Sequence, residues 1–192
     1  MKVLMLDADG VLVRNEAEDF VRDAALDLTL ATARSRLSAE QWKAIGTGRA
    51  DLGEVLATVM PDRELVERLI AYGMASETHI DPDMLAAVGR IRAGGVRIFL
   101  ATNQENRRAR YLMETLGLGR EFDGILHSAG LGYRKPDAEY FAVARERAGV
   151  LPEEIVFIDD SARNVDAARR AGWTATHWQG DLSLEEAIAA AR

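Results

Sequence analysis

The chain has 192 residues, a length that predicts one domain, or one domain with a modest insertion. With 48% apolar and 29% charged residues, its composition is that of a globular protein and excludes the disordered and fibrous classes. The absence of cysteine excludes a disulfide framework, a thiolate metal site and a cysteine nucleophile. The net charge of -7 argues against a nucleic-acid partner, because such partners are bound largely through phosphate contacts.

The apolar stretch at the N-terminus is short, since it runs only from Val3 to Leu6 before Asp7 interrupts it. The sequence therefore predicts neither a signal peptide nor a membrane span. We expect a cytoplasmic protein that is a monomer or a homodimer, that contacts no membrane, and whose partner is a small soluble molecule. The lack of cysteine is compatible with a reducing compartment.

Short apolar runs and amphipathic helical segments alternate in the second half of the chain. One predicted strand lies at the N-terminus, Val3–Leu6. The other four lie in the second half: Val96–Ala101, Gly124–His127, Ile155–Ile158 and Thr174–Trp178. The predicted helices of this part are Met84–Ala93, Glu105–Leu116, Ala138–Ala148, Val165–Ala171 and Leu184–Ala191. This alternation is typical of an α/β fold, with a parallel sheet of about five strands and helices on both faces.

Residues 15–81 interrupt the alternation, because this stretch contains no strand pattern and reads as helical throughout. Its apolar spacing predicts several short helices. We therefore expect an α/β core made of residues 1–14 and 82–192, with an all-helical cap domain, residues 15–81, inserted between them. The edges of the insertion would lie at Arg14-Asn15 and within Ser76–Asp83.

Polar residues directly after the predicted strands are the candidates for chemistry, because parallel sheets bind ligands at the carboxyl ends of their strands. Asp7 and Asp9 follow the first strand, and Gly10 allows the chain to turn tightly away. An Asp-x-Asp pair has little specificity by itself, and Asp81-Pro82-Asp83 is another instance. The position after a buried strand is what makes Asp7 and Asp9 candidates.

Two further strand ends carry polar residues, each with two interpretations. Thr102 and Asn103 come where a hydroxyl and free backbone N–H groups can hold an anion, but Thr102 and Glu105 also have the spacing of a capping box. Asp159 and Asp160 are adjacent carboxylates, which repel each other unless a cation lies between them, and hard oxygens suit Mg²⁺. The alternative for this pair is one helix cap and one solvated acid.

Lys135 lies in a loop that leads into a helix and is one of only three lysines among 24 basic residues. Lysine acts on phosphate as a compact point charge, whereas arginine presents a fork. An ordinary surface lysine is the alternative. The histidines His79, His127 and His177 have no metal-ligand spacing, so we interpret them as structural or supporting.

The order, spacing and strand-end placement of these segments together resemble the four motifs of the haloacid dehalogenase-like (HAD) superfamily. The segments read VLMLDADGVL, IFLATNQ, GYRKPD and VFIDDSARNVDAA. The resemblance covers residues 1–14 and about 82–192. It implies a Rossmann-like α/β core with a helical cap inserted after the first motif, and the chain is most similar to capped sugar-phosphate phosphatases and phosphomutases.

The resemblance also implies a role for each residue. Asp7 would be the nucleophile that attacks phosphorus and forms an aspartyl-phosphate, and Asp9 would protonate the leaving alcohol and then deprotonate the attacking water. Thr102 and the N–H of Asn103 would hold phosphoryl oxygens, while Lys135 would offset the negative charge of the nucleophile and of the transferring group.

The implied cofactor is Mg²⁺, held by Asp7, the backbone carbonyl of Asp9, and Asp160, with Asp159 bound directly or through a water. The implied function is hydrolysis of a small phosphorylated metabolite. A phosphomutase acting on a sugar phosphate is the alternative, because it uses the same core residues.

Two other classes are less favoured. Dehalogenases of this fold lack the second aspartate of the first motif, so Asp9 argues for phosphoryl transfer, although the intervening Ala8 is common in dehalogenases. A receiver domain, which would be a signalling switch, places its acidic pair early, whereas here Asp159 and Asp160 follow Lys135.

Specificity is expected to come from cap side chains such as Asn15, Trp42, Lys43 and Arg49.

Overall fold

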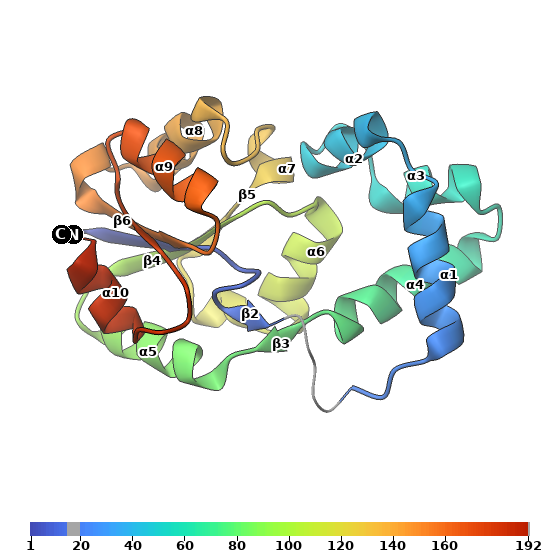
Figure 1. Ribbon diagram of the computed structural model, residues 1–192, viewed down its shortest axis with the longest axis horizontal. Helices are drawn as coiled ribbons and strands as arrows, with labels where there is room; N and C mark the ends of the chain where they lie inside the picture. The colour runs from blue at the N-terminus through green and yellow to red at the C-terminus, as the bar shows by residue number, and fades with distance from the viewer. Residues whose placement is uncertain (15–19, 192) are drawn as a thin grey trace.

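The computed structural model describes residues 1–14 and 20–191. Its centre is a parallel five-stranded sheet in the order β5-β4-β1-β6-β7 (Figure 1). The strands are β1 (Val3–Leu6), β4 (Arg97–Thr102), β5 (Gly124–His127), β6 (Ile155–Asp159) and β7 (Thr174–His177). Every strand end lies within one residue of the expected position, so the predicted sheet is confirmed.

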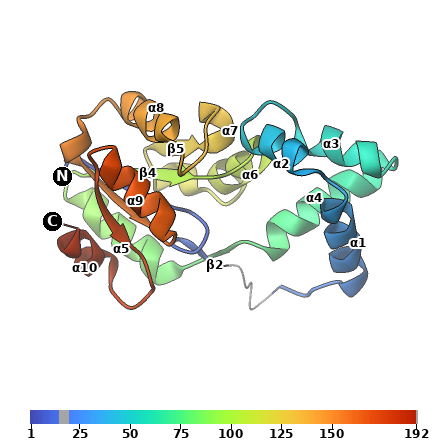
Figure 2. The ribbon, with the colours of Figure 1, turned by 45° about the horizontal axis from the view of Figure 1, so that its top comes forward.

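Helices cover both faces of the sheet (Figures 1 and 2). All four side chains of β1 are buried, and they alternate between two apolar clusters, one on each face. The helices that complete the clusters are α5 (Pro82–Ala93) and α10 (Leu184–Ala190) on one face, and α8 (Ala138–Ala148) and α9 (Ala162–Arg170) on the other. This arrangement confirms the predicted α/β class.

Some helices differ in detail from the expected ones. The segment predicted as one helix over 105–116 consists of α6 (Asn106–Arg110) and a π-helical turn (Tyr111–Thr115). Helix α9 begins three residues earlier than predicted. Helix α7 (Ser128–Leu131) and the 3₁₀ turns Leu118–Arg120 and Pro152–Glu154 were not predicted, because elements this short show no periodicity. None of the described helices is long and apolar enough to cross a membrane.

Four helices pack together to one side of the sheet (Figures 1 and 2). They are α1 (Ala24–Ser35), α2 (Ala39–Gly46), α3 (Leu52–Val59) and α4 (Arg63–Ser76). Each begins after a residue whose side chain accepts hydrogen bonds from N–H groups of the first turn, and these residues are Asp23, Ser38, Asp51 and Asp62. Their apolar side chains form a third cluster, separate from the two on the sheet.

A two-stranded antiparallel ribbon joins this helical bundle to the sheet. It pairs β2 (Val13–Arg14) with β3 (His79–Ile80). The expectation that 15–81 is helical throughout is therefore wrong at its C-terminal end, because strands of two residues are too short to produce an alternating pattern. The expected edge at Asn15 lies outside the described residues.

Two arginines of α6 also connect the sheet to the bundle. Arg107 forms ion pairs at 2.7 Å with both Asp51 and Glu67. Arg108 donates to Thr78 Oγ1 at 3.0 Å and to the backbone oxygen of Glu77 at 3.3 Å. Helix α6 therefore contacts the start of α3, the middle of α4 and the residues that follow α4.

Because an aromatic cluster fills one face of the sheet, we expect truncation of one of its side chains to destabilise the protein strongly. Phe141 is completely buried and packs edge-to-face against Tyr140, Phe157 and Trp173. We expect Phe141→Ala to lower the free energy of unfolding, measured by urea denaturation, by about 3–5 kcal/mol. The control Leu151→Ala, at a 55% exposed position, should change it by less than about 0.5 kcal/mol. Equal effects would contradict the role of the cluster.

Candidate functional site

The carboxyl ends of β1, β4 and β6 lie side by side at one edge of the sheet. Leu6 of β1 is in register with Ile158 of β6, and Asp7 N–H donates to the Ile158 oxygen at 2.9 Å. The structure therefore brings together the side chains that were predicted from their positions after strands. They are Asp7, Asp9, Thr102, Asn103, Lys135, Asp159 and Asp160.

The turn after β1 depends on a glycine and an alanine. Gly10 has a φ of 79°, in the left-handed region that glycine adopts without strain. A Cβ at this position would lie 2.2 Å from Asp160 Oδ2, so the missing side chain also leaves room for that carboxylate. Ala8 is completely buried, and its carbonyl accepts a hydrogen bond from Leu12 N at 2.9 Å. The turn thus holds the two aspartates of the first motif in place.

Lys135 is buried with 3% of its surface exposed, so the surface-lysine alternative is wrong. Its Nζ lies 2.9 Å from Asp7 Oδ2 and 2.5 Å from Asp159 Oδ2, and it donates to the Ala101 oxygen at 2.8 Å. The ammonium group also lies 5.3 Å from the centre of the Phe157 ring. Because a buried charge is stabilised mainly by its partners, these contacts define where the ammonium can lie.

Asn103 holds the loop that carries Lys135. Its side-chain Nδ2 donates to the Lys135 oxygen at 2.9 Å, and its Oδ1 accepts from Lys135 N at 2.8 Å. The side chain of Asn103 therefore positions the lysine. Its backbone N–H was the group predicted to hold phosphate, and that role stays a prediction.

Thr102 does not cap a helix, so the capping interpretation is wrong. Helix α6 begins only at Asn106, and its N-cap residue is Glu105, whose carboxylate accepts from the N–H groups of Arg107 and Arg108. Thr102 instead ends β4 with 1% of its surface exposed, and hydrogen bonding from its side chain lowers the pKa of Asp7.

Burial raises the pKa of Asp7 from its ordinary 3.8 to about 7. The charge of Lys135 acts in the opposite direction, and the neighbouring carboxylate of Asp159 raises the pKa further. Burial is the largest of these effects. A cation beside Asp7 favours the ionised form that a nucleophile needs.

The two carboxylates after β6 have different surroundings. Asp159 is completely buried, and its oxygens accept from Lys135, from Ser161 N at 2.8 Å and from Asn164 Nδ2 at 3.0 Å. Asp160 is more exposed, and burial together with the charge of Asp159 raises its pKa. Asn164 was not predicted, because nothing in its local sequence distinguishes it from any helical asparagine.

Asp7, Asp159 and Asp160 could hold a metal ion, since each offers an oxygen within 4.8 Å of the others. Three ionised carboxylates and the ammonium of Lys135 carry a net charge of -2 (-3 + 1). A hard divalent cation with oxygen ligands fits this set of donors. The predicted contribution of the Asp9 carbonyl stays a prediction.

Two residues that were not predicted hold Asp9. Gln104 Nε2 donates to Asp9 Oδ2 at 2.5 Å, and Arg108 Nη2 donates to Asp9 Oδ1 at 2.9 Å. Gln104 is close to Thr102 in sequence, which is a weak signal. Arg108 is one of 21 arginines, and no local pattern marks it as the partner of a residue 99 positions away.

The expected specificity residues have different positions. Trp42 lines a cavity on the Asp9 side of the site, and Lys43 lines a second cavity beside Asn103 and Lys135. Arg49 lines neither cavity. Asn15 lies outside the described residues.

The three histidines have no common site. His177 Nε2 lies 2.8 Å from the Asp160 oxygen, so it supports the backbone of a predicted metal ligand. His127 Nε2 lies 3.0 Å from Asn106 Oδ1. His79 is part of β3. These positions agree with a structural or supporting role.

The family model for haloacid dehalogenase-like hydrolases matches residues 1–172. The chain belongs to this family. It is 28% identical over 185 residues to a phosphoglycolate phosphatase of Rhodospirillum rubrum, which covers 89% of this chain and 76% of the relative. It is 30% identical over 188 residues to phosphoglycolate phosphatase 1 of Pseudomonas aeruginosa, which covers 89% and 66%. For other relatives of that name the match spans about half of their length.

A solved structure shares the whole architecture. It is that of a HAD family enzyme from Bacteroides thetaiotaomicron in complex with magnesium and inorganic phosphate, with a TM-score of 0.75. The match covers 97% of this chain and 98% of that chain at 17% identity, so it shows a common fold. The predicted HAD-like α/β fold is confirmed.

The raised pKa of Asp7 predicts a pH dependence of stability in the metal-free protein. Since the pKa is about 7 in the folded state and 3.8 ordinarily, the stability that protonation contributes is complete below about pH 4 and is lost as the pH rises through about 7. We expect the free energy of unfolding, measured in EDTA, to fall between about pH 4 and about pH 7. Asp7→Asn removes this titration, and a fall of the same size in that variant would contradict the assignment.

Proposed function

We propose that the protein is a Mg²⁺-dependent phosphatase that hydrolyses a small phosphorylated metabolite through a phosphorylated Asp7. The observation that carries the proposal is the burial of Lys135 between Asp7 and Asp159 at the edge of the sheet, with Asp160 beside them. The phosphatase names of the curated relatives support it.

In the first step, a carboxylate oxygen of Asp7 attacks phosphorus and the bond from phosphorus to the ester oxygen breaks. Asp9 gives its proton to the departing oxygen, so the leaving group departs as an alcohol. In the second step, a water attacks the phosphorus of the aspartyl-phosphate while Asp9 takes one of its protons. Inorganic phosphate leaves, and Asp7 is free again as a carboxylate.

Three groups hold the phosphoryl oxygens during both steps: the Thr102 hydroxyl, the backbone N–H of Asn103 and the ammonium of Lys135. Lys135 also reduces the repulsion between ionised Asp7 and the incoming phosphate. Because Asn103 holds the Lys135 backbone and Gln104 holds Asp9, the loop after β4 positions both the cation and the proton donor.

Asp7, Asp160 and the carbonyl of Asp9 would hold the Mg²⁺, and Asp159 would assist directly or through a water. When bound, Mg²⁺ neutralises charge on the phosphoryl group and on the nucleophile. The hydrogen bonds of Asp159 to Lys135, Ser161 and Asn164 favour Asp160 as the direct ligand of the pair.

The expected division of the chain stays part of the proposal, with a core of residues 1–14 and 82–192 and a cap of residues 15–81. The cap covers the site on the side of Asp9. The cytoplasmic location, the monomeric or dimeric state and the lack of a nucleic-acid partner stay predictions.

The alternatives have less support. A phosphomutase is not favoured, because the relatives carry phosphatase names. A dehalogenase does not need a proton donor at the position of Asp9. A receiver domain has its acidic pair before its lysine in the sequence, which is the reverse of the order in this chain.

The first test of this function removes the nucleophile and the metal separately. Asn at position 7 preserves the shape of the side chain but cannot form the phosphorylated intermediate. We expect Asp7→Asn to abolish phosphate release from phosphate monoesters while circular dichroism shows a folded protein. We also expect EDTA to abolish the wild-type activity and excess Mg²⁺ to restore it. Retained turnover in either experiment would overturn the proposal.

The second test compares two neighbouring basic residues. The ammonium of Lys135 fits between two carboxylates, where a guanidinium is too large and differently shaped. We expect Lys135→Arg to lower kcat by on the order of 100-fold or more. The matched control Arg134→Lys keeps the positive charge of an exposed side chain and should stay within about twofold of wild type. Comparable rates for both variants would mean that the shape of the buried cation does not matter.

A further inference from the structure

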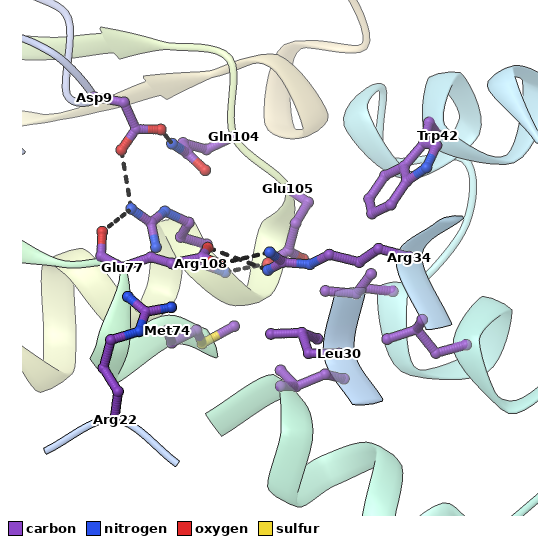
Figure 3. A pocket seen from close by; sticks show the side chains of 13 residues that line it. Asp9, Arg22, Leu30, Arg34, Trp42, Met74, Glu77, Gln104, Glu105 and Arg108 are labelled. Atoms are coloured by element: carbon purple, nitrogen blue, oxygen red, sulfur yellow. Dashed lines mark hydrogen bonds and ion pairs between the residues drawn. The ribbon is translucent and has the colours of Figure 1, made fainter. Parts of the chain in front are cut away.

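A cavity of about 590 Å³ lies between the helical bundle and the sheet, on the side of the site that contains Asp9 (Figure 3). In Figure 3, Asp9 is held at one end of the cavity by Gln104 and Arg108, while Trp42 and Leu30 lie on the bundle side. This volume is within the range of small-molecule sites. Because Asp9 is the proposed proton donor, the leaving group of the substrate departs into this cavity.

The bundle contributes an apolar wall to the cavity. The wall consists of side chains from all four helices, and they are Leu30, Trp42, Leu52, Leu56, Ile70 and Met74. Leu56 and Ile70 belong to the apolar cluster of the bundle, and Trp42, Leu52 and Met74 pack against it. Their surfaces therefore gain free energy from contact with an apolar ligand that displaces water.

The cationic side chains in the lining already have anionic partners. Arg22 pairs with Asp27 at 2.8 Å, and Arg34 pairs with Glu77 at 2.5 Å. The third, Arg108, donates to Asp9. Among the described residues, Arg22 and Arg34 are therefore already engaged by acids. When Asp9 carries the proton that it donates, Arg108 keeps its hydrogen bonds to Thr78 Oγ1 and the Glu77 oxygen.

Glu105, the remaining acid of the lining, is itself engaged. Its carboxylate accepts hydrogen bonds from the backbone N–H groups of Arg107 at 2.7 Å and Arg108 at 2.5 Å. A carboxylate on the leaving group would therefore enter a cavity that also contains Glu77 and Glu105 and whose arginines already have hydrogen-bond partners. Burying it there would mean competing with these partners for the arginines, which costs free energy.

The opposite side of the site has a different character. A second cavity, beside Asn103 and Lys135, is lined by the exposed basic residues Lys43, Arg134 and Arg163. Asp9 does not line this cavity. Positive charge is thus concentrated beside the phosphoryl group and is balanced where the leaving group departs.

We infer that the leaving group of the substrate is an uncharged, predominantly apolar alcohol, alkyl or aryl, that fills the cavity between Asp9 and the apolar wall. This inference rests on the proposed phosphatase function and specifies its substrate class. It sets this chain apart from the relatives named phosphoglycolate phosphatase, because the glycolate part of that ester is a short carboxylate.

A series of primary n-alkyl phosphates tests the inference, because ethanol, butanol and hexanol have nearly the same acidity and differ in apolar length. With the full chain and Mg²⁺, we expect kcat/KM to rise roughly threefold per methylene, or on the order of 80-fold from ethyl to hexyl phosphate. Phosphoglycolate should have a lower kcat/KM than ethyl phosphate.

Variants on the wall provide the matched comparison. Trp42→Ala and, as a second change, Met74→Gln should each reduce the ratio of hexyl to ethyl phosphate kcat/KM by about fivefold or more. The control Leu28→Ala alters an apolar side chain of α1 that is 71% exposed and does not line the cavity, so its ratio should equal that of wild type.

The outcomes separate the two proposals. If wild type hydrolyses ethyl phosphate and phosphoglycolate but kcat/KM does not rise with alkyl length, the inference is wrong and the phosphatase function stands. Phosphoglycolate turned over as efficiently as hexyl phosphate would also overturn it, and would direct attention to Lys43, Arg134 and Arg163 as the carboxylate site. If no phosphate ester is hydrolysed under any of these conditions, the proposed function fails and the inference fails with it.

Discussion

The ammonium group of Lys135 holds the catalytic end of the sheet together. It lies 2.9 Å from Asp7 and 2.5 Å from Asp159, two carboxylates that end neighbouring strands and would otherwise repel each other in a buried place. Removing one partner from such a buried arrangement leaves an uncompensated charge, which costs several kcal/mol. Asn103 holds the lysine backbone and the Phe157 ring lies beside the ammonium, so the loop after β4 and the aromatic cluster both serve this contact. The interaction that stabilises the edge of the sheet is therefore also the one that would prepare Asp7 for attack in the proposed mechanism.

The α/β core could be predicted because its strands and main helices can each be recognised locally. Each has apolar residues at the spacing typical of its structure and is bounded by residues that end such elements. The ends of parallel strands meet at one edge whatever their order, so Asp7, Thr102 and Asp159 could be brought together before the strand order was known. The contacts of long side chains could not be predicted, because Arg108 and Asp9 are 99 positions apart and nothing local couples them. The Thr102 segment was ambiguous for another reason: a hydroxyl followed by a glutamate fits both a capping box and a phosphate-binding loop, and only the observed start of α6 distinguishes them.

Helix α6 links the cap to the proton donor. Arg107 is paired with Asp51 and Glu67 of the bundle, while the next residue, Arg108, contacts Asp9 as well as Glu77 at the end of the bundle. A displacement of the bundle relative to the sheet therefore changes the surroundings of two adjacent arginines at once. Since one of them orients Asp9, the position of the cap and the orientation of the proposed general acid are mechanically connected.

Under the proposed function, the two sides of the site would bind the two parts of an ester by different forces. A chain with a net charge of -7 repels a phosphate dianion at long range, so attraction has to come from nearby cations: buried Lys135, exposed Lys43, Arg134 and Arg163, and a bound Mg²⁺. Interactions of exposed charges are screened by salt, whereas burial of apolar surface is not. The phosphate end therefore provides attraction that is common to all phosphate esters and sensitive to ionic strength. Discrimination among esters has to come from the other side, where charges are paired and the remaining surface is apolar, because only there does the shape and polarity of the leaving group change the binding free energy.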